Sequence, residues 1–180
     1  KKDIFIHQLV NIRGSLPNIG DVLELTVNRE YRNDVQRNHT ATHILHKALR
    51  EVLGTHVEQS GSMVDNERLR FDFSHYESIT PDQLKEIEKI VNRVIMDNTE
   101  LTVNYEDIQT AKDRGAMALF SDKYGDTVRV VEIPGFSIEL CGGTHVKSTG
   151  EIGFLNIESE AGIASGVRRI TAITGNKALQ

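Results

Sequence analysis

The chain has 180 residues, of which 38% are hydrophobic and 26% are charged, and its formal net charge is −5. This composition is typical of a globular protein with a packed core, and the apolar runs are far shorter than the roughly 20 residues that a membrane helix needs. The negative charge argues against a domain that holds nucleic acid by bulk electrostatics, so any such contact must depend on local basic patches such as Arg168-Arg169 or Arg68 and Arg70. We therefore expect a cytoplasmic protein with no membrane partner.

The first 32 residues are expected to form a small β element, consistent with the tail of a barrel. Gly14 and Pro17-Asn18 indicate turns, and the run over 22–27 favours a strand. A soft boundary near 33–38 then divides the chain into residues 1–32 and 33–180. The second part opens with a helix predicted over 35–53, because Gly54 stands where a helix C-cap is expected.

The remaining elements mix helices and strands without a regular βαβ alternation. A long helix is predicted to begin at Thr80, because this capping residue is followed by Pro81 and by Gln83 at the capping-box position. A short helix is predicted over 106–114. Strands are predicted over 57–64, 69–73, 101–105, 127–133, 137–140, 152–158 and 167–173. This order favours an α+β fold, with helices packed on a largely antiparallel sheet.

Two short motifs predict a metal site. His39 and His43 are four residues apart on the first predicted helix, so they lie on one face, one turn apart. Cys141 and His145 enclose Gly142-Gly143, which allows a tight turn that brings the thiol and the imidazole together. Three histidines and one cysteine suit zinc, which favours nitrogen and sulfur ligands in tetrahedral geometry.

The helical wheel supports this interpretation. At about 100° per residue, His39, His43 and His46 lie roughly opposite the apolar stripe of the helix. A lone histidine is usually a satisfied polar residue, but two at ligand spacing together with the only cysteine of the chain favour a shared metal. We expect His46 to lie behind the ligands or at the surface. Thr40 stands where the zinc protease motif needs a glutamate, which argues against that class.

Six segments together resemble the editing domain of bacterial-type alanyl-tRNA synthetases. They are RNHTATHILH at 37–46, HVEQSGS at 56–62, LRFDFSH at 69–75, AMALF at 116–120, ELCGGTH at 139–145 and GVRRI at 166–170. The resemblance covers nearly the whole chain, and residues 1–32 resemble the linking β-barrel that precedes the editing fold.

The resemblance implies a zinc-dependent hydrolase for tRNA(Ala) that carries serine or glycine by mistake. The implied zinc ligands are His39, His43, Cys141 and His145. The resemblance implies that Thr42 and Gln59, with Thr40 nearby, line the pocket that meets the aminoacyl group. We further expect backbone N–H groups around Gly142 and Gly143 to hold the developing oxyanion. Arg168 and Arg169 are candidate contacts to the RNA. The resemblance also implies a parent enzyme that attaches alanine to tRNA(Ala) with ATP and Mg²⁺ in an upstream module, and that oligomerises through a C-terminal region.

Several alternatives remain open at the level of the sequence. Cys141, His145 and Gln59 are the catalytic candidates, but Cys141 is either a ligand or a nucleophile, and His145 is either a fourth ligand or a general base. The rival functions are a freestanding editing protein, the editing domain of threonyl-tRNA synthetase and a structural zinc module that binds RNA.

Overall fold

The computed structural model describes residues 6–117 and 125–179. The segment 118–120, part of one of the six resembling stretches, lies outside the described residues. Residues 6–28 contain no helix or strand, and apolar side chains such as Val22 and Leu25 are exposed. The strand predicted over 22–27 is therefore wrong, because a strand needs a hydrogen-bonded neighbour and a packed face to be stable. The division into residues 1–32 and 33–180 stays a prediction.

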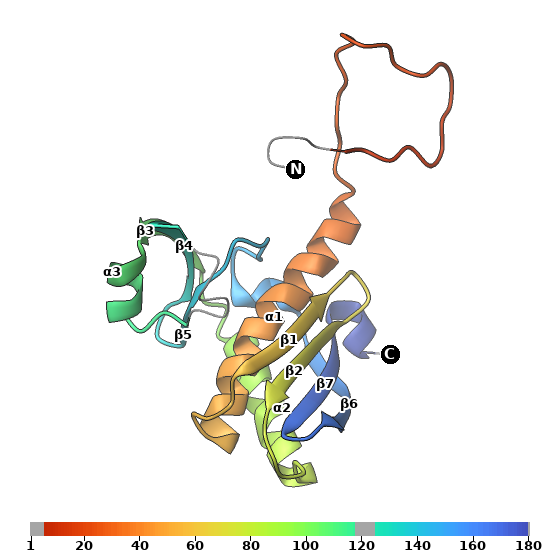
Figure 1. Cartoon of the computed structure of the whole chain (residues 1–180). Helices are drawn as coiled ribbons and strands as arrows, with labels where there is room; N and C mark the ends of the chain where they lie inside the picture. Colours follow the sequence, from red (N-terminus) through yellow and green to blue (C-terminus); the bar gives the residue numbers. More distant parts are fainter. Residues whose placement is uncertain (1–5, 118–124, 180) are drawn as a thin grey trace.

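Helix α1 (Arg29–Leu53) is the central element of the molecule. It begins six residues before its predicted start, because the side chain of Asn28 caps it by accepting a hydrogen bond from the Tyr31 amide. It ends as predicted at Gly54, whose positive φ of 117° is strained for other residues. The helix thus runs without a break across the expected boundary near residue 33 (Figure 1).

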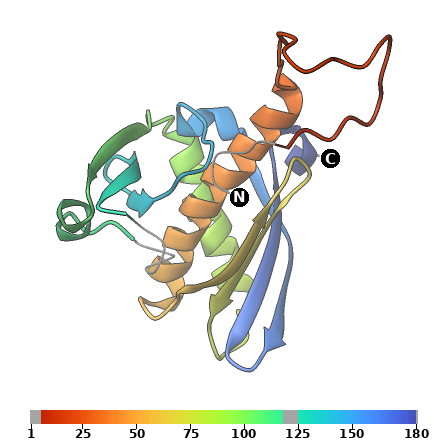
Figure 2. The ribbon, with the colours of Figure 1, turned by 45° about the horizontal axis from the view of Figure 1, so that its top comes forward.

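The larger sheet is antiparallel, with the order β1-β2-β7-β6. Its strands are β1 (Gln59–Val64), β2 (Leu69–Ser74), β7 (Val167–Thr174) and β6 (Leu155–Ala164). Helices α1 and α2 (Pro81–Met96) pack against one face of this sheet, as the turned view in Figure 2 shows. The capping box at Thr80 is confirmed, since its hydroxyl accepts from the Gln83 amide and the Gln83 side chain accepts from the Thr80 amide.

The main core fills the space between these two helices and the larger sheet. It contains Ile44, Leu45 and Leu49 of α1, Ile87, Val91 and Ile95 of α2, and Leu69, Phe71, Phe73, Ile170 and Ala172 of the sheet. The apolar stripe of α1 therefore faces the larger sheet, as the helical wheel predicts.

A second, three-stranded antiparallel sheet lies on another side of α1, where the sequence predicts a single sheet (Figure 1). Its order is β3-β4-β5, and α3 packs on it around a small core of its own. These elements are β3 (Thr102–Asp107), α3 (Ile108–Asp113), β4 (Thr127–Ile133) and β5 (Ser137–Leu140), and the short 3₁₀ turns are η2 (Thr149–Ile152) and η3 (Gly175–Leu179). The α+β class with antiparallel sheets is confirmed.

Within the described ranges, no helix combines the length and the apolar character required to cross a membrane.

Candidate metal centre

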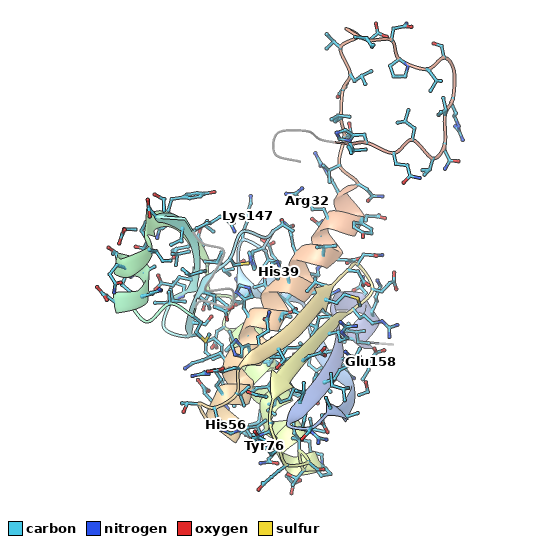
Figure 3. The ribbon with its side chains drawn as sticks, viewed as in Figure 1. Arg32, His39, His56, Tyr76, Lys147 and Glu158 are labelled. Carbon is cyan, nitrogen blue, oxygen red and sulfur yellow. The ribbon has the colours of Figure 1, made fainter. Side chains whose placement is uncertain are left out.

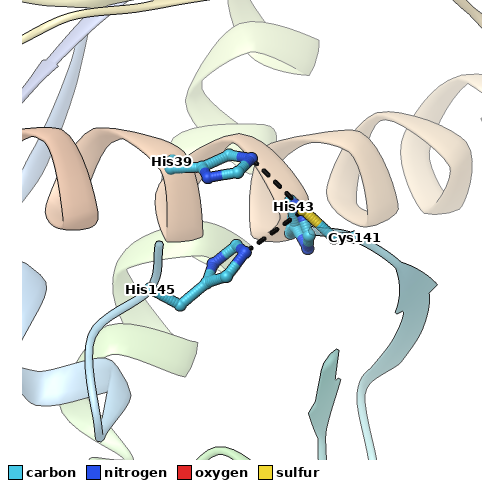
Figure 4. Close-up of side chains that lie close together, drawn as sticks. All are labelled: His39, His43, Cys141 and His145. Atoms are coloured by element: carbon cyan, nitrogen blue, oxygen red, sulfur yellow. Dashed lines mark hydrogen bonds between the residues drawn. The ribbon is translucent and has the colours of Figure 1, made fainter. Parts of the chain in front are cut away.

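The four predicted ligands come together from two separate parts of the chain. His39 and His43 project from α1, while Cys141 directly follows β5 and His145 lies four residues later in the same loop (Figure 4). One ligand atom from each residue lies within 4.8 Å of the others. Cys141 Sγ is 3.5 Å from His39 Nε2 and 3.3 Å from His145 Nε2.

These distances fit a zinc ion. Tetrahedral zinc with nitrogen at about 2.0 Å and sulfur at about 2.3 Å holds neighbouring nitrogen and sulfur ligands about 3.5 Å apart. The two measured separations from Cys141 Sγ match that value, and three imidazoles with one thiol form a donor set that zinc prefers.

The other ring nitrogen of each histidine also supports a metal site. Each Nδ1 lies beside an oxygen atom: the Thr144 carbonyl for His39 at 3.1 Å, the Thr40 hydroxyl for His145 at 3.1 Å and the Glu139 carboxylate for His43 at 3.3 Å. Metal-binding histidines commonly use the remote nitrogen in this way, because the oxygen fixes the tautomer and the orientation of the ring. The Nε2 atoms therefore remain available to the metal.

Burial shifts the pKa values of these groups and so sets their protonation states before a cation binds. It lowers the pKa of His43 well below its usual value and that of His145 to about 3, so both imidazoles are neutral at pH 7. Neutral imidazole is the form that binds metals. Burial raises the pKa of the Cys141 thiol, so this group carries its proton in the metal-free protein and releases it when a metal binds.

Glu139 and His46 form a buried polar pair behind His43. A Glu139 oxygen is 3.9 Å from His46 Nδ1, and the His46 ring packs at 5.1 Å from the Phe71 ring. Burial raises the pKa of Glu139 to about 8 and lowers that of His46 to about 4, which favours the neutral form of each. Glu139 is not among the functional residues that the sequence predicts. The sequence does contain a pattern that could have identified Glu139. It stands two residues before Cys141, which directly follows β5, and alternate residues of an extended segment point to the same side.

A cavity of about 360 Å³ opens beside the ligands. Of the residues predicted to meet the aminoacyl group, Thr42, Gln59, Gly142 and Gly143 line it, together with Ser62 and the apolar Val64 and Phe71. The Thr42 hydroxyl donates to the Asn38 carbonyl, which leaves its lone pairs free to accept. In the described part of the chain, the Gln59 side chain makes no hydrogen bond, so its amide is available to a ligand.

The two glycines differ in their backbone N–H groups. The Gly143 amide donates to Cys141 Sγ at 3.5 Å, which favours the thiolate. The Gly142 amide has no partner among the described residues, and Gly142 is exposed at the cavity. Gly142 thus presents a free donor where an oxyanion could be held.

The remaining predicted contact residues lie away from this cavity. Thr40 is completely buried beneath His145, and its hydroxyl also accepts from the Val146 amide. Arg168 and Arg169 are on β7, where Arg168 pairs with Glu160 and Arg169 pairs with both oxygens of Asp72 at 2.7 and 2.8 Å. The charges of both arginines are therefore satisfied within the sheet.

A comparison with protein families matches residues 128–171 to the threonyl and alanyl tRNA synthetase second additional domain. The match contains nearly all of β4, β5 and the loop with Cys141 and His145, so this part of the chain is similar to that domain.

Curated relatives narrow this class to the alanine enzymes. The chain is 57% identical to the alanine–tRNA ligase of Fusobacterium nucleatum over 175 residues, and 54% and 56% identical over 176 residues to those of Pseudomonas entomophila and Pseudomonas fluorescens. Each alignment covers 97% of this chain and 20% of the relative, so the chain spans about one fifth of the length of these ligases. The matches confirm the resemblance and support an alanyl-tRNA synthetase fragment.

Proposed function

We propose that this chain is an editing unit that hydrolyses tRNA(Ala) wrongly charged with serine or glycine, at a zinc ion held by His39, His43, Cys141 and His145. One observation carries the proposal: three of the four ligand residues, His39, His43 and Cys141, line a cavity of about 360 Å³ whose other walls carry polar groups without a partner among the described residues. A purely structural zinc site needs no such cavity beside its ligands.

The need for a second hydrolytic site follows from the chemistry of alanine selection. A pocket built for alanine cannot exclude the smaller glycine, and it discriminates weakly against serine, which adds only a hydroxyl. Binding differences of this size give roughly 10–200-fold selectivity, so an editing step is needed. The cavity suits that step, because Gln59 and Ser62 offer partners to a serine hydroxyl that the alanine methyl cannot use.

Different residues of the cavity would have different roles in ester hydrolysis. With four protein ligands, a tetrahedral zinc ion would have no open position, so it would supply Lewis-acid chemistry to the ester or to water only by taking a fifth ligand, and would otherwise hold the walls of the cavity in place. The free Gly142 amide is placed to stabilise the negative charge that develops on the ester oxygen. Thr42 and Gln59 orient the amino acid, and the apolar Val64 and Phe71 limit the space around it.

The geometry favours ligand roles for the two residues that the sequence left open. Cys141 Sγ lies at ligand separation from two imidazole nitrogens, and a thiolate bound to a metal is a poor nucleophile. His145 resembles His39 in having Nδ1 occupied by an oxygen and Nε2 directed at the cluster. We further propose that the parent protein is an alanine–tRNA ligase that uses ATP and Mg²⁺ elsewhere, binds the aminoacyl end of tRNA(Ala) here and oligomerises through its C-terminal region.

The test is hydrolysis of seryl-tRNA(Ala) beside alanyl-tRNA(Ala), with the zinc-loaded protein and after chelation. Selective release of serine that chelation abolishes and zinc restores is the expected result, and Cys141→Ala should abolish it. Thr110→Ala, on the far side of the small sheet, is a matched control that should retain activity. Equal release from both tRNAs, or full activity of a zinc-loaded Cys141→Ala protein, would refute the assignment. Failure of both this chain and a full-length ligase would favour the structural module.

A further inference from the structure

A second cavity lies on the other side of the 141–145 loop. It has a volume of about 530 Å³ and shares Gly142 and Gly143 with the first cavity, while His145 contributes to its wall. The two cavities are therefore separated only by the loop that carries two of the metal ligands. A molecule whose end enters the first cavity would leave its next part beside the second.

The second cavity is basic although the chain is acidic. Arg32, Arg129 and Lys147 line it, opposed by the single carboxylate of Glu100. Figure 3 places Arg32 and Lys147 near each other between α1 and the smaller sheet, with His39 beneath them. We call this cavity the basic groove.

The charges of the basic groove are not used within the protein. Among the described residues, neither Arg32 nor Lys147 has an ion-pair partner, in contrast to Arg168 and Arg169 on β7. Arg32 also lies in the first turn of α1, where the helix dipole makes a cation unfavourable and attracts an anion. Such an arrangement costs stability unless an anionic ligand is present.

Arg129 links the basic groove to the metal loop. Its Nη1 donates to the carbonyl oxygens of Cys141 and Gly143 at 2.7 and 2.8 Å, and its other N–H groups have no partner among residues 6–117 and 125–179. A phosphate on Arg129 would thus lie beside the loop that the ester must reach.

The outer wall of the groove carries an exposed aromatic ring. Tyr105 is 73% exposed and Val103 is 43% exposed, both on β3. An aromatic ring beside several free cations is the usual way to hold single-stranded nucleic acid, because bases stack on the ring while cations contact phosphates. An acidic peptide would need the cations but would gain little from the ring.

We propose that the basic groove binds the last unpaired nucleotides of the RNA, with phosphates on Arg32, Arg129 and Lys147 and a base on Tyr105. The proposal rests on the proposed function, since it is the aminoacyl end of the same RNA that enters the first cavity. The terminal ribose then lies at Gly142-Gly143, where the two cavities meet.

Binding tests the groove without any hydrolysis. The probe is a fluorescein-labelled hexaadenylate with a free 3′ hydroxyl, and anisotropy is measured over a range of salt concentrations. Each lost phosphate contact should reduce the slope of log K against log salt by about 0.7, so the double substitution Arg32→Gln/Lys147→Gln should reduce it by about 1.4. Tyr105→Ala should weaken binding about 5- to 150-fold. Lys89→Gln, an exposed cation on α2, is the matched control.

A hydrolysis experiment tests the proposal for the basic groove independently of the proposed function. Seryl-tRNA(Ala) is compared with the 3′-seryl ester of adenosine, which has no phosphate. The Arg32→Gln/Lys147→Gln protein should lower the ratio of kcat/KM for the tRNA to that for the nucleoside ester by at least tenfold. An unchanged ratio and an unchanged salt slope would overturn the groove while leaving the hydrolase intact. If the wild-type protein hydrolyses neither ester, the proposed function is contradicted. The binding experiment then still shows whether the basic groove binds single-stranded RNA. Equal affinity for heptaglutamate, unaffected by Tyr105→Ala, would assign the groove to an acidic peptide and overturn the proposal.

Discussion

Adding one methyl group at Gly143 should remove zinc without unfolding the protein. A Cβ atom there would lie 2.1 Å from His39 Cε1 and 2.6 Å from Nδ1, whereas carbon atoms in contact normally stay about 3.5–4.0 Å apart. The loop cannot easily retreat, because Arg129 holds the carbonyl oxygens of Cys141 and Gly143. The His39 ring must therefore move by more than about 1 Å, while metal sites tolerate only about 0.2 Å in a ligand distance.

The neighbouring Gly142 provides the matched control. A Cβ atom on Gly142 meets nothing within 4 Å, and neither glycine has the positive φ that would strain alanine. Loss of a supporting contact to a ligand usually costs 10- to 100-fold in affinity, so loss of His39 itself should exceed about 100-fold. Zinc affinity is measured by competition with a chromophoric chelator, and urea unfolding of the metal-free proteins checks the fold. Equal zinc affinity of Gly143→Ala and Gly142→Ala would refute this reasoning.

Four further measurements examine other parts of the structure. Glu139→Leu should weaken zinc binding about 10- to 100-fold in the same competition assay, because it removes the oxygen that lies beside His43 Nδ1. Asp72 has a pKa lowered by its hydrogen bond to Arg169, so the stability lost in Asp72→Asn should be full at neutral pH and vanish as the pH falls below about 4, as followed by urea unfolding. Thr80→Ala should cost about 1 kcal/mol in urea unfolding through loss of the cap of α2. Chelation of zinc should speed amide hydrogen exchange in β3, β4 and β5 more than in the larger sheet, because the metal ligands join the smaller sheet to α1.

Features with a local cause could be predicted from the sequence. The end of α1 at Gly54 and the start of α2 at Thr80 depend on residues within one turn of the boundary, and both are confirmed. Strands β4 and β5 have the predicted bounds, because alternation of side chains is also a local pattern. The two predicted ligand pairs lie together for the same reason, since each spacing of four residues is local, while their binding of a metal stays a prediction.

Features that depend on distant partners could not be predicted. Arg168 and Arg169 look like free cations in the sequence, but Asp72, 97 residues from Arg169, neutralises one of them across the sheet. The burial of Glu139 and His46 requires the second sheet, which the sequence did not separate from the first. The basic groove draws its residues from α1, β3, β4 and the loop after β5, so no single segment shows it.

The location of the four predicted ligands depends on both sheets. The larger sheet takes up the apolar stripe of α1, which leaves the histidine face of that helix to the smaller sheet. The loop after β5 then brings Cys141 and His145 to the histidine face of α1, and β5 itself places Glu139 beside His43. The cavity of about 360 Å³ beside the ligands and the basic groove both border this loop. A small movement of β5 relative to α1 would therefore alter the four predicted ligands and both cavities together. The proposed hydrolysis should therefore depend on the packing between the smaller sheet and α1 as well as on the ligands themselves.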